Sequence, residues 1–251
     1  MEIDAYLRRI GFGGRVLLDA NTLGAIHQAH LYSVPFENLD IGLGRPIQLD
    51  LERIYQKVVT RRRGGFCYEL NGLLGWLLRE LGFGVTLVSA QGANADGGFS
   101  AEYDHLLLLV TCPGDARRWL ADVGWGAGFE TPLDVDAFGA QAAGRGTWRI
   151  DRGGGYSSLW QQTGSGGWIQ QYRFTLAGRA YSEFAGMCAY HQTSPSSIFV
   201  QKKLCTLFTA DGRVTLSQDK LIITRGAESD ERDVPETQRA EVLKQYFGVV
   251  L

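Results

Sequence analysis

The spacing of apolar residues changes along the chain and separates helical from extended segments. Up to about residue 83, apolar residues recur every three or four positions, which predicts helices over 4–10, from about 21 to 34, 51–59 and 67–81. From residue 85 the period is two, which predicts strands at 85–90, 105–110, 118–123, 146–151, 156–162 and 167–175. In about the last 70 residues, the pattern predicts short helical pieces over 182–199, strands at 204–209, 213–216 and 219–224, and a helix over 237–247. An α+β protein with an antiparallel barrel or meander in its middle is expected.

Composition narrows the class of protein. The 251 residues are 45% hydrophobic and 21% charged, as in ordinary soluble proteins, and the net charge of -2 suggests neither nucleic acid nor an anionic membrane as a partner. The first residues lack a basic segment followed by an apolar one, so we expect a cytoplasmic protein. Four cysteines without C-x-x-C spacing are expected to be free thiols.

Cys67 is the first candidate for chemistry. It follows Gly64-Gly65, which permit a sharp turn, and it stands where a helix of regularly spaced leucines begins. The unpaired N–H groups of a first helical turn favour a thiolate, and Arg61, Arg62 and Arg63 act in the same direction. The alternative is an inert buried cysteine, and only a partner for the thiol can decide between the two.

His105 and Asp122 are the candidate partners. Both lie in apolar segments, where an unpaired polar side chain is costly. If Cys112 is opposite Asp115 or Arg117 in a hairpin, Asp122 lies directly across from His105 or one diagonal step away on the same face. With Cys67 they give nucleophile, base and orienter, a set that performs acyl transfer through a thioester.

Other polar residues have more ordinary interpretations. Glu37, in an apolar turn after Pro35 and Phe36, needs a cation if it is buried, and Arg62 or Arg63 is nearby. His27 and His30 are three residues apart on a helix, but no third ligand can be placed, so they are interpreted as surface or core histidines and no metal site is predicted.

Four motifs resemble those of the arylamine N-acetyltransferases: 63–71 (RGGFCYELN), 35–38 (PFEN), 104–107 (DHLL) and 122–126 (DVGWG). The resemblance implies a helical domain 1–83, a β-barrel domain 84–190 and an α/β lid 191–251, around a core like that of cysteine proteases and transglutaminases. It also implies that Cys67, His105 and Asp122 form a catalytic triad and that Glu37 and Arg63 form a structural ion pair.

The same resemblance implies the substrates. Acetyl-CoA is expected as co-substrate with no bound cofactor, an arylamine, arylhydrazine or N-hydroxyarylamine as acceptor, and a monomer or homodimer as the active form. Phe36, Trp125, Phe129 and Phe199 are similar in position to the apolar walls of the family's cleft. Trp125 stands where the family commonly has Phe, so the acceptor pocket is expected to be smaller or reshaped.

Two other functions remain open at the level of sequence. A transglutaminase-like cysteine hydrolase or amidase would use the same order of Cys, His and Asp to cleave an amide. A binding module without activity would leave buried His105 and Asp122 with a desolvation cost and no task, which makes it the weakest alternative.

Overall fold

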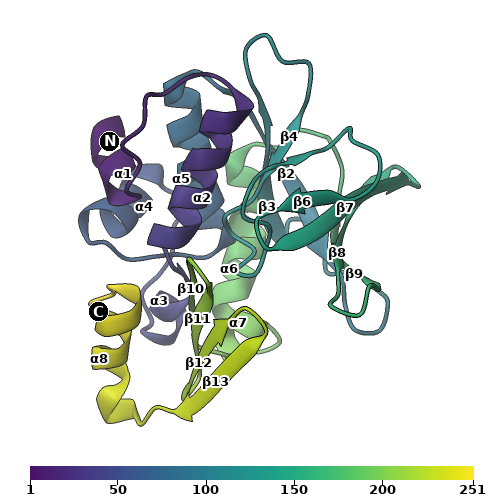
Figure 1. Cartoon of the computed structure of the whole chain (residues 1–251). Coiled ribbons are helices and arrows are strands. Elements are labelled where there is room, and N and C mark those ends of the chain that lie inside the picture. Colours follow the sequence, from purple (N-terminus) through teal and green to yellow (C-terminus); the bar gives the residue numbers. More distant parts are fainter.

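The computed structural model describes residues 1–251, with helices beside a β-barrel and a second sheet at the chain end (Figure 1). The helical elements before the barrel are α1 (Ile3–Arg9), α2 (Ala20–Ser33), α3 (Leu39–Gly42), α4 (Leu51–Tyr55), the π-helix Gln56–Thr60 and α5 (Cys67–Leu81). The four predicted helices are all present, α4 continuing as the π-helix, whereas α3 is too short for a periodic signal. None of the helices has the length and apolar character needed to cross a lipid bilayer.

The middle of the chain forms a nearly closed antiparallel barrel. Its strands are β2 (Gly84–Gly92), β3 (His105–Thr111), β4 (Trp119–Ala121), β5 (Leu133–Asp134), β6 (Gln141–Ala143), β7 (Gly146–Gly153), β8 (Tyr156–Gln162) and β9 (Trp168–Phe174), in the order β5-β4-β3-β2-β9-β8-β7-β6. The Gln141 side chain links the two edges, accepting from the Asp134 N–H at 2.8 Å and donating to its carbonyl at 2.9 Å. The predicted α+β fold with a barrel is confirmed, while β5 and β6 are too short to be read from alternation.

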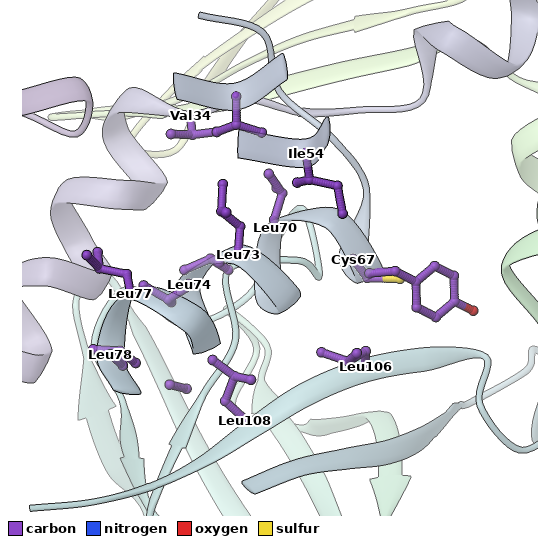
Figure 2. Close-up of a cluster of buried hydrophobic side chains, with 14 of the residues drawn as sticks. Val34, Ile54, Cys67, Leu70, Leu73, Leu74, Leu77, Leu78, Leu106 and Leu108 are labelled. Carbon is purple, nitrogen blue, oxygen red and sulfur yellow. The ribbon is translucent and has the colours of Figure 1, made fainter. Parts of the chain in front are cut away.

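Strand β3 is shared by two hydrophobic cores, which explains its uninterrupted apolar sequence. Leu106 and Leu108 pack with the leucines of α5 (Figure 2). Val110 belongs to the same core. Leu107 and Leu109 point the other way, into the barrel core. Because successive side chains of a strand alternate between faces, one strand joins the helical part to the barrel.

The C-terminal sheet takes one strand from the first part of the chain. Its strands are β10 (Leu204–Thr209), β11 (Gly212–Ser217), β12 (Lys220–Arg225) and β13 (Glu228–Asp233), with η2 (Tyr181–Phe184), α6 (Ala185–Thr193) and α7 (Ile198–Gln201) before them and α8 (Glu236–Phe247) after them. Segment β1 (Phe36–Glu37) pairs with β10, Phe36 opposite Thr206. The interpretation of this segment as a turn is therefore wrong. The fully exposed β13 has no buried face and gives no alternating pattern.

The two glycines before α5 are required for close packing. A Cβ on Gly64 would lie 2.0 Å from the Pro35 carbonyl oxygen, and one on Gly65 would lie 2.8 Å from the Cβ of Glu69. The Gly65 carbonyl accepts from the Glu37 N–H at 2.9 Å. Neither glycine has a positive φ; the left-handed residue is Arg62, with φ of 53°. The glycines thus let this loop lie against the segment that carries β1.

A buried cluster of ionised side chains holds the start of α5. Arg63 Nη2 lies 2.7 Å from Glu37 Oε1 and 3.1 Å from Asp40 Oδ1. Lys57 Nζ, carried by the π-helix, lies 2.8 Å from Asp40 Oδ2 and 2.9 Å from Glu69 Oε1. Glu69 also accepts the Phe66 N–H at 3.2 Å. The Glu37–Arg63 pair expected from sequence is therefore part of a larger network, whose other members give no sequence signal.

Replacing Lys57 by methionine should lower the free energy of unfolding by about 3–5 kcal/mol, because it leaves three buried carboxylates with one cation. The control is Arg53→Met on the neighbouring turn, where the exposed pair with Asp50, 4.0 Å apart, should contribute less than about 1 kcal/mol. Urea unfolding of both variants measures the difference. Equal losses would contradict a structural role for the Lys57 cluster.

Candidate functional site

Cys67 is the first residue of α5 and is almost completely buried, with 3% of its surface exposed. Burial raises the pKa of its thiol well above the ordinary value, although a hydrogen bond from the Leu106 N–H acts in the opposite direction. The position of Cys67 at a helix start and its burial therefore act in opposite directions on the pKa of the thiol. A base therefore has to take the proton.

His105 and Asp122 meet at the end of the barrel interior. Leu108 is opposite Ala121, which is the second of the two predicted registers and puts Asp122 one diagonal step from His105 on the same face. His105 Nε2 lies 2.8 Å from Asp122 Oδ2, and both side chains are buried. The pair therefore has the geometry of a base held by an orienting carboxylate, with Nδ1 of the ring left for another partner.

The Asp122 carboxylate accepts hydrogen bonds from four groups. Oδ1 accepts from Asn71 Nδ2 at 2.8 Å and from the Gly124 N–H at 2.9 Å. Oδ2 accepts from His105 and from the Tyr172 hydroxyl, which is 3.1 Å away. Burial alone would raise the pKa of Asp122, but the charge of His105 and these hydrogen bonds hold it below its usual value. The carboxylate is therefore ionised although it is buried.

Asn71 connects the helix that carries Cys67 to Asp122 and to the backbone of β3. It lies four residues after Cys67 on α5, so the two share a helix face. Besides Asp122, its amide donates to the Leu106 carbonyl at 2.6 Å and accepts the Val123 N–H at 2.9 Å. Sequence reasoning assigned Asn71 no role, although its spacing from the candidate nucleophile was a usable signal. Tyr172 gave no such signal, because its contact depends on how the barrel closes.

The loop that follows Asp122 lies directly against Cys67. A Cβ on Gly124 would be 2.6 Å from the Cα of Cys67 and 2.7 Å from Asn71 Nδ2. Only a residue without a side chain fits there, which explains the glycine in this motif. The loop that follows Asp122 is therefore in van der Waals contact with the start of α5, where the candidate nucleophile lies.

The four candidate aromatic residues of the cleft occupy different surroundings. The ring centroid of Trp125 is 4.9 Å from that of His105, edge to face. Phe36 and Phe199, from β1 and α7, have ring centroids 6.2 Å apart. Phe129, by contrast, is buried in the barrel core and does not line an open surface in this structure. Of these four rings, Trp125 is thus the one in contact with the candidate base, which the Tyr172 ring also approaches with centroids 5.5 Å apart.

A second histidine also lies beside a carboxylate: His191 Nε2 is 3.2 Å from Asp104 Oδ1. All four cysteines are free and buried. No group of three His, Cys, Asp or Glu side chains is arranged to hold a metal ion.

Comparison with known proteins identifies relatives over the full chain. A family model described as N-acetyltransferase matches residues 19–251. The chain is 38% identical to the arylamine N-acetyltransferase of Mycolicibacterium smegmatis and 34% identical to human arylamine N-acetyltransferase 1, in alignments covering 100% of this chain and 93% and 95% of the relatives. The structure of Mycobacterium marinum arylamine N-acetyltransferase in complex with CoA superposes with a TM-score of 0.92 and 30% identity, covering 99% of this chain and 93% of that one.

Gly124→Ala should lower the free energy of unfolding by about 1–3 kcal/mol, because the new methyl group would meet backbone atoms that cannot rotate away. It should also slow alkylation of Cys67, whose surroundings the loop would disturb. Gly128→Ala is the control, since its Cβ would be at an ordinary 3.5 Å from its nearest neighbour. Urea unfolding and mass-spectrometric alkylation rates compare the two. Identical behaviour of both variants would show that the loop can move aside.

Proposed function

The chain belongs to the arylamine N-acetyltransferase family, and we propose that it transfers the acetyl group of acetyl-CoA to an aromatic amine, hydrazine or N-hydroxyarylamine by way of Cys67. The observation that carries this proposal is the buried His105–Asp122 hydrogen bond beside the helix start that bears Cys67. The CoA complex of the M. marinum relative supports acetyl-CoA as the donor. The relatives give no support to the alternative of a transglutaminase-like hydrolase.

In the first half of the reaction, His105 takes the proton of the Cys67 thiol and the thiolate attacks the carbonyl carbon of acetyl-CoA. The unpaired N–H groups of the first turn of α5 stabilise the tetrahedral oxyanion. The intermediate collapses by breaking the bond to the CoA sulfur, which receives the proton from the imidazolium. Cys67 then carries the acetyl group as a thioester, and free CoA leaves.

Asp122 determines which nitrogen of His105 acts as the base. An ionised carboxylate only accepts hydrogen bonds, so Nε2 of His105 carries the proton that it donates to Asp122 Oδ2. The lone pair of neutral His105 is then on Nδ1, which is available to the thiol. The negative charge of Asp122 also stabilises the imidazolium that forms when the thiol proton moves.

In the second half, the amine nitrogen attacks the thioester carbonyl and His105 takes the proton that this nitrogen loses. The bond to the Cys67 sulfur then breaks, and the thiolate recovers the proton from the imidazolium. Exclusion of water prevents hydrolysis of the thioester, and the burial of Cys67 supports this requirement. An aromatic amine is weakly basic, arrives uncharged at neutral pH and stacks on aromatic side chains. Phe36, Trp125 and Phe199 form the walls of the acceptor pocket. Trp125 makes this pocket narrower than would the phenylalanine that the family commonly has there.

We propose that access to Cys67 is controlled by the third of three domains, 1–83, 84–190 and 191–251. Acetyl-CoA can reach a buried thiol only if a covering segment moves. Phe199 of α7 packs against Phe66, the residue before Cys67, with ring centroids 5.8 Å apart. The protein is expected to act in the cytoplasm as a monomer or homodimer, without a bound metal or cofactor.

Mixing the protein with acetyl-CoA alone should add one acetyl group to Cys67 and release one equivalent of CoA, because the first half-reaction needs no acceptor. Intact-mass analysis followed by peptide mapping measures it. An arylamine added afterwards should remove the acetyl group and appear as its N-acetyl product. Cys67→Ser should lose both steps, since an alcohol is not ionised by this site. Acetylation elsewhere, or amide cleavage without CoA release, would refute the proposal.

Asp122→Asn should preserve the fold and lower the saturating turnover rate by about 10³–10⁴. The amide oxygen can still accept from Asn71 and Gly124, but the amide nitrogen then faces Nε2 of His105 and forces its proton to Nδ1. The ring can no longer accept the thiol proton. Circular dichroism checks folding, and single-turnover acetylation checks the rate. A folded variant with wild-type rates would remove Asp122 from the mechanism.

A further inference from the structure

His27, on the helix α2, holds two backbone groups with its two ring nitrogens. Its side chain is completely buried, and it was interpreted from sequence as an ordinary helix histidine. Nε2 lies 3.1 Å from the backbone nitrogen of Asp122, and Nδ1 lies 3.0 Å from the carbonyl oxygen of Glu130. A backbone N–H only donates and a carbonyl only accepts, so His27 is neutral, with its proton on Nδ1.

These two hydrogen bonds fix both ends of one loop. The loop runs from Asp122 to Glu130, between β4, which ends at Ala121, and β5, which begins at Leu133. It carries the candidate carboxylate and the ring of Trp125 that contacts His105. His27 also stacks in parallel on Phe129, inside the same loop, with centroids 5.7 Å apart and planes at 8°. One side chain from the helical part therefore contacts the loop near both of its ends.

The two ends differ in how much they depend on His27. At the Glu130 end, the carboxylate side chain is held by the Tyr32 hydroxyl and by Arg145 Nε, the latter at 2.9 Å. At the Asp122 end, His27 is the partner of the backbone N–H. Loss of this acceptor would leave a buried donor unpaired, so the chain at Asp122 would shift to find another. Loss of His27 should therefore displace the loop mainly at Asp122.

We propose that His27 is a positioning residue for catalysis, which acts by fixing the backbone of Asp122 and so the direction in which its carboxylate meets His105. This inference rests on the proposed function of the triad. His27 acts through the backbone of the loop, and above all through its hydrogen bond to Asp122. Burial, which lowers the pKa of His27, supports the role by keeping the ring neutral, because a second ring proton would confront the Asp122 N–H.

The chain contains a matched control. His30 lies three residues further along α2 and is equally buried, but neither of its ring nitrogens has a hydrogen-bond partner. Its replacement by leucine removes a buried histidine from the same helix without removing a hydrogen bond to the loop. A purely structural effect of changing an α2 histidine should therefore appear in both variants.

Two amide substitutions separate the two hydrogen bonds. The amide oxygen of glutamine reaches the position of Nε2, so His27→Gln can still accept from Asp122. The shorter amide of asparagine reaches the position of Nδ1, so His27→Asn can still donate to Glu130 but loses Asp122. His27→Leu loses both hydrogen bonds.

The experiment measures the saturating rate of Cys67 acetylation by acetyl-CoA in a single turnover, the acetyl-CoA concentration at half-maximal rate, and the melting temperature of each variant. His27→Leu and His27→Asn should lose about tenfold or more in the saturating rate, with the half-maximal concentration unchanged, because the geometry of attack is disturbed and binding is not. His27→Gln should recover most of the rate, and His30→Leu should match the wild type.

The inference is overturned if folded His27→Leu acetylates within twofold of the wild type, or if the glutamine and asparagine variants are equally fast. Should the leucine variant not fold, the comparison of the two amides decides, because each keeps one hydrogen bond. Absence of Cys67 acetylation in the wild-type protein would instead refute the proposed function itself, which separates the two failures.

Discussion

The buried negative charge of Asp122 is the constraint on which the site depends. A carboxylate removed from water is stable only if its oxygen atoms are fully hydrogen-bonded. Its donors come from α5, β3, β9 and its own loop, so the charge is satisfied only when the helices, the barrel and the loop have all come together. The requirement that keeps Asp122 ionised therefore also brings its partners into register around Cys67.

Much of this arrangement could be predicted because it is local. The leucine spacing of α5 and the unbroken apolar stretch of β3 follow directly from the periods of helix and strand. The hairpin between β3 and β4 is short, so counting from Cys112 gave two registers that place Asp122 and His105 on one face, and the structure has the second of them; a register shifted by one residue would have put them on opposite faces. These contacts could therefore be predicted because the residues that form them are close in sequence.

The features that sequence could not supply depend on distant contacts. The role of Tyr172 follows from the pairing of β9 with β2, which brings residues far apart in sequence together at the end of the barrel. The contribution of Lys57 depends on a π-helical turn that directs its ammonium inward to Asp40 and Glu69. The burial of Cys67 could not be predicted from its position at a helix start, because it depends on segments that are distant in sequence. The spacing of apolar residues predicts which face of a helix is buried. The exposure of a single side chain depends on the packing of the whole protein.

The pairing of β1 with β10 has a consequence for how the molecule is made. These two strands meet only after some 170 intervening residues have been synthesised, since Phe36 lies opposite Thr206. During translation the first helices emerge with one strand edge still lacking its neighbour, and exposed edges of this kind are where nascent chains associate wrongly. The native sheet can therefore form only after β10 has left the ribosome. The C-terminal part of the chain then provides the neighbour that β1 lacks.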